Sequence, residues 1–183
     1  MYNRQTLYFK NGGVEQTIPT LEAVINWLPI IKPAAIIVSS TTGETALKAG
    51  EILKDQNIRI IAASFQKNLW TKWGAPDENF ISKSRKLGVE FLPNEPIVSF
   101  LDSEYPDIVN AWRTISSGFK VALQVASMCV DTGMIKPGSN VIALGGTIHG
   151  SDTAVSVEIY GYDNILKTNI TGIIAMPIAK RTR

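Results

Sequence analysis

Four consecutive hydroxyl side chains, Ser39 to Thr42, are followed by Gly43 at the point where a β-branched run changes to a helix-forming run. The backbone N–H groups in the first turn of a helix lack partners within the helix, and the helix dipole favours an anion there. Hydroxyl groups add hydrogen-bond donors, and glycine lets a ligand approach the backbone closely. This order of residues indicates a phosphate-binding loop. Its members are Ser39, Ser40, Thr41, Thr42, Gly43, Glu44 and Thr45.

Plain helix capping is an equally good interpretation of this loop on its own. Serine and threonine are frequent N-cap residues wherever a strand turns into a helix. Glu44 falls in the first helical turn, where a carboxylate simply complements the helix dipole, and we favour that role over catalysis. The loop therefore leaves phosphate binding and capping with equal weight.

Two further loops, residues 64–73 and 145–153, also follow runs that are typical of buried parallel strands. Ligands of open α/β sheets bind outside the carboxyl ends of the strands, so the three loops should share one edge. Aromatic side chains in residues 64–73 are suited either to stacking on a ligand ring or to packing in a lid or interface. The binding positions that these loops add are Ser64, Phe65, Gly145, Gly146, Thr147, His149 and Gly150.

The charged residues of these loops have simpler interpretations. His149 is the only histidine, and exposure in a loop is favoured over a role in ligand contact or acid–base chemistry. Asp152 is expected to hold its loop together. Lys67 and Lys72 are interpreted individually as solvated lysines, although both are able to neutralise an anionic ligand.

Several kinds of active site lack support in the sequence. There is no glycine-rich dinucleotide fingerprint, no phosphate-binding GxxxxGK[ST] motif and no GxSxG elbow. One histidine and one cysteine exclude a His/Cys metal site, and no carboxylates cluster as metal ligands, so no metal is expected. Cys129 lies in an apolar helical context typical of buried packing. No catalytic residue is assigned.

The composition predicts one globular domain that spans residues 1–183. Hydrophobic residues make up 45% of the chain and charged residues 19%, which is typical of a folded domain. A net charge of +2 is too small to indicate nucleic-acid or membrane binding. The first residues lack the apolar run of a signal peptide, and no stretch has the length of a membrane span, so a cytoplasmic protein is expected.

The pattern of elements predicts an α/β fold. Residues 35–39, 44–55 and 58–63 read as strand, helix and strand, which form a right-handed βαβ unit. Thr20 is expected to cap a helix over residues 21–31. Further helices are expected over residues 79–87 and 106–131, and further strands over residues 7–9, 89–92, 140–144, 155–159, 165–168 and 173–176.

The predicted helix over residues 106–131 is unusually apolar, with only Lys120 charged between Arg113 and Asp131. Such a helix needs cover on more than one side. We favour a central place in the fold, while an interface of a homo-oligomer remains the alternative, and a homo-oligomer is the expected assembly. The Ser116–Gly118 stretch marks either a break into two helices or a tight helix contact.

Segments spread over most of the chain resemble the C-terminal domain of pyruvate kinase, above all the stand-alone, mostly archaeal and bacterial proteins made of that domain alone. The segments are IIVSSTTGETALKAGEIL, SSGFKVALQVASMCVDTGMI, VIALGGTIHGSDTAVSV and IIAMP, with LYFKNGG near the start. No single motif is decisive, but their order and spacing agree. The resemblance implies a three-layer α/β/α fold with a mixed, mostly parallel sheet, and no kinase activity, because the catalytic barrel has no counterpart.

The resemblance also implies a ligand. In the regulated kinases the matching loop holds one phosphate of a sugar bisphosphate, and here it corresponds to residues 40–45. A second effector loop of those kinases carries arginine, whereas residues 146–153 have none, so one phosphate is expected rather than two. Similar stand-alone proteins look able to hold flavin mononucleotide (FMN), which becomes the leading ligand. Similar proteins tend to have histidine or glycine after the second strand, and Ser64 and Phe65 depart from that pattern.

Three functions follow from these observations. The first is a regulatory or ligand-binding module for a phosphorylated small molecule such as FMN. The second is an enzyme, either a flavin-dependent oxidoreductase or a transferase assisted by His149 or Glu44. The third is a homo-oligomeric interaction protein built on the apolar helix.

Overall fold

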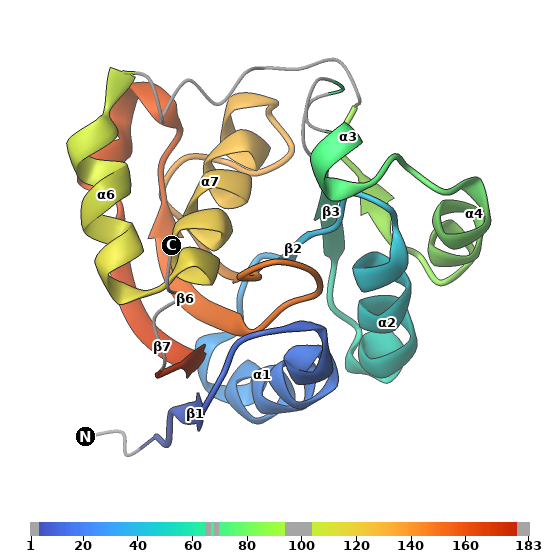
Figure 1. Ribbon diagram of the computed structural model, residues 1–183. Helices are drawn as coiled ribbons and strands as arrows, with labels where there is room; N and C mark the ends of the chain where they lie inside the picture. Colours follow the sequence, from blue (N-terminus) through green and yellow to red (C-terminus); the bar gives the residue numbers. More distant parts are fainter. Residues whose placement is uncertain (1–3, 65–66, 68–69, 94–103, 179–183) are drawn as a thin grey trace.

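The computed structural model describes residues 4–64, 67, 70–93 and 104–178 (Figure 1). Within these residues a seven-stranded sheet has the order β1-β7-β6-β5-β2-β3-β4, and β6 alone is antiparallel to its neighbours. This confirms the mixed, mostly parallel sheet. The strands are β1 (Leu7–Phe9), β2 (Ile36–Ser39), β3 (Ile60–Ala63), β4 (Glu90–Phe91), β5 (Ser139–Gly145), β6 (Thr153–Ile159) and β7 (Asn169–Pro177).

Helices cover both faces of the sheet, so the predicted three-layer α/β/α architecture is confirmed. One face carries α1 (Thr17–Ile31) and α2 (Glu44–Leu53), with α4 (Glu78–Lys86) packed outside α2. The other face carries α7 (Ser117–Asp131), which α6 (Pro106–Ile115) covers (Figure 1). The described residues also contain the short helices η1 (Val14–Gln16), η2 (Lys54–Gln56), α3 (Trp70–Trp73) and η4 (Tyr162–Lys167).

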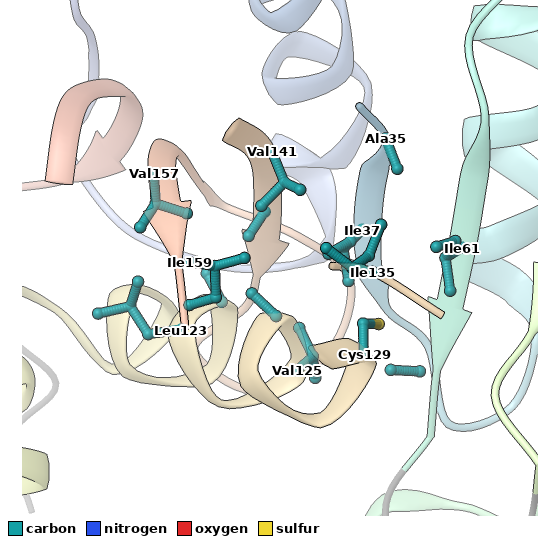
Figure 2. Close-up of a cluster of buried hydrophobic side chains, with 14 of the residues drawn as sticks. Ala35, Ile37, Ile61, Leu123, Val125, Cys129, Ile135, Val141, Val157 and Ile159 are labelled. Carbon is teal, nitrogen blue, oxygen red and sulfur yellow. The ribbon is translucent and has the colours of Figure 1, made fainter. Parts of the chain in front are cut away.

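Strand alternation divides the core into two clusters, one on each face. Ile36 and Val38 of β2 face α1 and α2, whereas Ile37 faces α7. Figure 2 shows the cluster on the α7 face, with Leu123 and Val125 of α7 beside side chains of the strands. Because central strands are buried on both faces, they read as continuous apolar runs in the sequence.

The predicted long helix is broken in two. Ser116 has extended backbone angles (φ −163°, ψ 161°), and its hydroxyl accepts the Phe119 N–H at 2.9 Å, which caps α7. The break is also a tight contact, since a Cβ at Gly118 would lie 2.6 Å from Asp152 Oδ1. The sheet and α6 cover α7 on different sides, which confirms its central place in the fold.

Two sequence predictions are wrong. The predicted strand over residues 165–168 is instead the end of η4, at Lys167, and its C-cap Thr168, because four residues are too few to fix a period and Ile165 packs with Val109 of α6. Thr20 lies inside α1 and does not cap it, because the helix begins at Thr17 with Pro19 in its first turn, where a missing N–H costs nothing.

Candidate functional site

Three connections of the sheet end at the same edge. They are the β2–α2 loop (residues 40–43), the connection that begins at Ser64 after β3, and the β5–β6 loop (residues 146–152). Because β5, β2 and β3 are parallel neighbours, their carboxyl ends are aligned, as the sequence predicted. After β2 the chain adds β3 and β4 on one side, and then returns to add β5 on the other. The sheet therefore has a switch point between β2 and β5, where ligands of such folds bind.

Two hydroxyls of the β2–α2 loop cap the helix that follows it. The Ser40 hydroxyl accepts the Ala46 N–H at 3.1 Å, and the Thr42 hydroxyl accepts the Glu44 N–H at 3.3 Å. Gly43, which follows Thr42, has a left-handed conformation (φ 97°), which glycine adopts without strain. Capping, one of the two interpretations of this loop, is therefore part of its structure.

Capping does not use every donor of the loop. Among the described residues, no acceptor is recorded for the backbone N–H of Thr45 or for the hydroxyls of Ser39 and Thr41. Ser39 and Thr41 are partly exposed, whereas the Thr45 side chain is buried. The unused donors lie at the positive end of the α2 dipole, where they are suited to an anion.

Glu44 makes a surface ion pair with Lys48, one turn along α2. Its Oε1 atom lies 2.8 Å from Lys48 Nζ, and its side chain is 47% exposed. An exposed pair of this spacing contributes little to stability. The carboxylate sits on the first turn of α2, which agrees with the electrostatic role favoured from the sequence.

The segment after α3 packs against the β2–α2 loop. The Asp77 N–H donates to the Thr42 carbonyl at 2.9 Å, and a Cβ at Gly74 would lie only 2.8 Å from Thr42 Cγ2. Trp73, beside Gly74, meets His149 edge to face with 6.4 Å between ring centroids and 78° between ring planes. Lys72 Nζ lies 5.0 Å from the centre of the Trp73 ring. The β2–α2 loop and the β5–β6 loop are thus linked through Gly74, Trp73 and His149.

Asp152 holds the β5–β6 loop, as the sequence predicted. The Thr147 N–H donates to Asp152 Oδ2 at 3.0 Å, and the Asp152 N–H donates to the Gly145 carbonyl at 3.1 Å. Asp152 has no exposed surface, whereas His149 at the tip of the loop is exposed. The exposed position of His149 is the simpler of its two predicted interpretations.

The connection from β1 into α1 also reaches this edge, which sequence reasoning missed. Figure 1 shows this blue segment beside the orange β5–β6 loop. The Thr17 hydroxyl accepts the Ser151 N–H at 3.0 Å, and a Cβ at Gly12 would collide with the Asp152 carboxylate and with Thr147. The adjacent glycines Gly12 and Gly13 were the available signal, because a Gly–Gly pair indicates close approach of another segment.

The structure thus brings nearly all of the predicted binding positions to one edge of the sheet. Phe65 lies outside the described residues. Ser64 directly follows β3 and is partly buried. The remaining positions gather at the end of β2, in the β2–α2 loop, in the first turn of α2, at the end of β5 and in the β5–β6 loop: Ser39, Ser40, Thr41, Thr42, Gly43, Glu44, Thr45, Gly145, Gly146, Thr147, His149 and Gly150.

The thiol of Cys129 is buried in the core. Burial raises the pKa of the Cys129 thiol to about 12, so this side chain is a packing residue and not a nucleophile at neutral pH.

Over the part of the chain that the structure describes, no group of three His, Cys, Asp or Glu side chains is arranged to hold a metal ion. Within the same residues no helix has the length and apolar character to cross a membrane. No model of a known protein family matches the chain.

Proposed function

We propose that this protein binds a phosphate-bearing small molecule, with FMN as the leading ligand, through residues 39–45. The observation that carries the proposal is the position of this loop. It joins the carboxyl end of β2 to the first turn of α2, next to the switch point between β2 and β5. In this proposal the domain is a regulatory or ligand-binding module, and it has no pyruvate kinase activity.

The donors that capping leaves unused support a phosphate at this loop. The Thr45 N–H lies in the first turn of α2, where the helix dipole favours an anion. The Ser39 and Thr41 hydroxyls add donors from partly exposed positions. The resemblance of the loop to the effector loop of pyruvate kinase supports the same assignment.

The surrounding residues support a ligand with one phosphate and a flat ring. The β5–β6 loop has no arginine that would clamp a second phosphate. The Trp73 ring pairs with the His149 ring, and Gly74, the next residue after Trp73, contacts Thr42 of the phosphate loop. Aromatic side chains pair favourably with flat rings, so a flavin ring suits this neighbourhood better than a sugar alone.

The test is titration of FMN into the purified protein, followed by flavin fluorescence, with inorganic phosphate as competitor. Binding should change the fluorescence, and phosphate should reverse the change. Thr41→Ala should weaken FMN binding about tenfold, because a hydrogen bond to a charged group contributes roughly 1.5–3 kcal/mol. Thr114→Ala is the matched control, since Thr114 lies on the exposed face of α6 and bonds only its own helix at Ala111.

Two outcomes separate the parts of the proposal. Unchanged flavin fluorescence, together with no flavin in the mass spectrum of the purified protein, excludes FMN. Phosphate binding that survives Thr41→Ala and Thr45→Ala together excludes the loop from the site.

A further inference from the structure

Asp152 is a carboxylate buried between the β5–β6 loop and the start of α7. Its exposed fraction is 0%, and among the described residues no cation is recorded beside it. Both oxygens accept hydrogen bonds from neutral groups: Oδ2 from the Thr147 N–H at 3.0 Å, and Oδ1 from the Thr153 hydroxyl at 2.9 Å. A buried carboxylate needs such compensation, because burial without partners costs far more than one hydrogen bond returns.

The hydrogen bonds continue from Asp152 into α7. Thr153 Oγ1 lies 3.2 Å from Ser116 Oγ, and Ser116 Oγ accepts the Phe119 N–H at 2.9 Å. A Cβ at Gly118 would lie 2.6 Å from Asp152 Oδ1, so the first turn of α7 lies directly against the carboxylate. The positive end of the α7 dipole therefore supplies part of the charge compensation that a cation would otherwise give.

The same carboxylate also meets the connection between β1 and α1. A Cβ at Gly12 would collide with Asp152 Oδ2, so only a glycine leaves room for the carboxylate on this side. Three segments that are distant in sequence therefore meet at one side chain: residues around Gly12, the start of α7 and the β5–β6 loop. A side chain in this position fixes the loop against two rigid neighbours.

The loop that Asp152 holds reaches the candidate phosphate site. His149 at its tip contacts Trp73, and Gly74 next to Trp73 contacts Thr42. A displacement of the β5–β6 loop would therefore move His149 away from Trp73 and from the contacts that lead to residues 39–45. Asp152 itself lies behind the loop and is fully buried, so it acts on the site only through the loop.

We propose that Asp152 is a positioning residue that sets the conformation of the β5–β6 loop and, through His149 and Trp73, the ligand affinity of the β2–α2 loop. The ligand part rests on the function proposed above, whereas the loop part holds without any ligand. The two parts are therefore measured separately.

Two variants of Asp152 separate its hydrogen bonds from its charge. Asp152→Ala leaves the Thr147 N–H without its acceptor, so the β5–β6 loop should open more often. Asp152→Asn keeps both bonds, because the Asn oxygen accepts from Thr147 while its amide donates to Thr153. The Thr153 hydroxyl is free to reverse, since either hydroxyl of the Ser116–Thr153 pair is able to donate.

Ser156→Ala is the matched control on the same strand. Ser156 is as deeply buried as Asp152, and its hydroxyl bonds Thr171 at 2.6 Å, away from the loop. The control therefore removes a partly buried hydrogen bond from β6 without touching the β5–β6 loop. It shows how much of any effect comes from general loss of stability.

Amide hydrogen exchange without ligand tests the loop part. Asp152→Ala should speed exchange over residues 146–151 by about tenfold or more, which corresponds to the loss of one buried hydrogen bond. Asp152→Asn should stay within about threefold of the unchanged protein, since its bonds are retained. Equal exchange in Asp152→Ala and Ser156→Ala would overturn the proposal. Should Asp152→Ala not fold, Thr153→Val removes one of the two partners, and an unchanged loop in that variant overturns it equally.

Tryptophan fluorescence tests the path through His149. The part of the emission that Trp73→Phe removes reports on the surroundings of this ring, where the His149 ring centroid lies 6.4 Å away and Lys72 Nζ 5.0 Å away. His149→Ala should change this part of the emission, and Asp152→Ala should change it in the same direction, whereas Asp152→Asn should leave it unchanged. An unchanged emission in Asp152→Ala, or a change there with none in His149→Ala, contradicts the path.

FMN titration tests the ligand part. Asp152→Ala should raise the dissociation constant about tenfold, and Asp152→Asn should restore it to within about threefold. Unchanged affinity in Asp152→Ala, with a loosened loop, overturns the ligand part alone. If the unchanged protein binds no FMN and no phosphate, the proposed function fails, and the exchange and fluorescence results still decide the role of Asp152.

Discussion

The β2–α2 loop and the β5–β6 loop lie side by side at one edge of the sheet, yet they are held in different ways. The β2–α2 loop is fixed by its own helix, through the bonds of Ser40 and Thr42 to amides six and two residues away. The β5–β6 loop is fixed by Thr17, which is 134 residues from its partner Ser151, and by the buried Asp152. The Thr42 carbonyl also accepts the Asp77 N–H, and Asp152 bonds Thr147 of its own loop, so each loop has one bond of the other kind. The β2–α2 loop is nevertheless held mainly by its own helix, whereas the β5–β6 loop depends more on the assembled fold.

This difference predicts how each loop responds to change. A loop held mainly by its own helix forms together with that helix and should loosen most when its own caps are removed. A loop held by distant segments forms after those segments have met, so it should be sensitive to changes far away in sequence. Substitutions that act on one loop and spare the other are therefore the direct test.

The largest effect is expected at Gly145, where β5 enters the β5–β6 loop. A Cβ there would collide with the Gly118 carbonyl and lie 2.6 Å from the Ala122 N, both of which are backbone atoms of α7. Backbone yields less than a side chain, so Gly145→Ala should lower the free energy of unfolding by roughly 3 kcal/mol. Thermal unfolding should show a fall in Tm of about 10 °C for a chain of this length.

Gly133→Ala is the control for Gly145→Ala. Gly133 has a positive φ of 75°, but no atom lies within 4 Å of a Cβ built there. Its cost should be limited to the left-handed strain of about 1–2 kcal/mol. A Gly145→Ala variant no less stable than this control would show that the end of β5 is not tightly packed on α7.

The next effect is expected at Gly43, in the β2–α2 loop. Its φ of 97° strains any other residue, and a Cβ would lie 3.0 Å from Ile81 Cγ1 and 3.1 Å from Phe80 Cβ of α4. Gly43→Ala should therefore cost roughly 2 kcal/mol in a urea titration. Amide exchange should rise over residues 40–47 and remain unchanged over residues 146–151. A rise in both loops would contradict their independence.

The local loop was largely readable from the sequence, and the remote one was not. The β-branched run, the hydroxyls and Gly43 predicted both the βαβ unit and the turn, because strand, cap and helix preferences are local. Asp152 was assigned to its loop for the same reason. The Gly12–Gly13 pair signals a close approach. That Gly12, Thr17 and Gly118 are partners of this loop could not be found, because nothing in a single sequence records which distant segments meet. The failed strand over residues 165–168 has a similar cause, since its contact with α6 decides its structure.

A smaller effect is expected at Thr17, the distant partner of the β5–β6 loop. Thr17→Val keeps the shape of the side chain but leaves the buried Ser151 N–H without an acceptor, at a cost of about 1–2 kcal/mol. Thr20→Val is the matched control on the same helix, because the buried Thr20 hydroxyl has no partner among the described residues. The control should be neutral or slightly stabilising. If both variants lose equal stability, the Thr17 bond does not hold the loop.

The smallest effect is expected at Ser40, the local counterpart of Thr17. Ser40→Ala removes the acceptor of the Ala46 N–H, and the loss of such a cap costs about 1 kcal/mol. Thr42→Ala should cost less, because its bond to the Glu44 N–H is longer, at 3.3 Å, and partly exposed. Amide hydrogen exchange in Ser40→Ala should rise over residues 44–47 alone. In Thr17→Val, by contrast, it should rise in the β5–β6 loop and leave residues 44–47 unchanged. FMN affinity that survives Ser40→Ala but falls in Thr41→Ala would assign capping and phosphate binding to different hydroxyls of one loop.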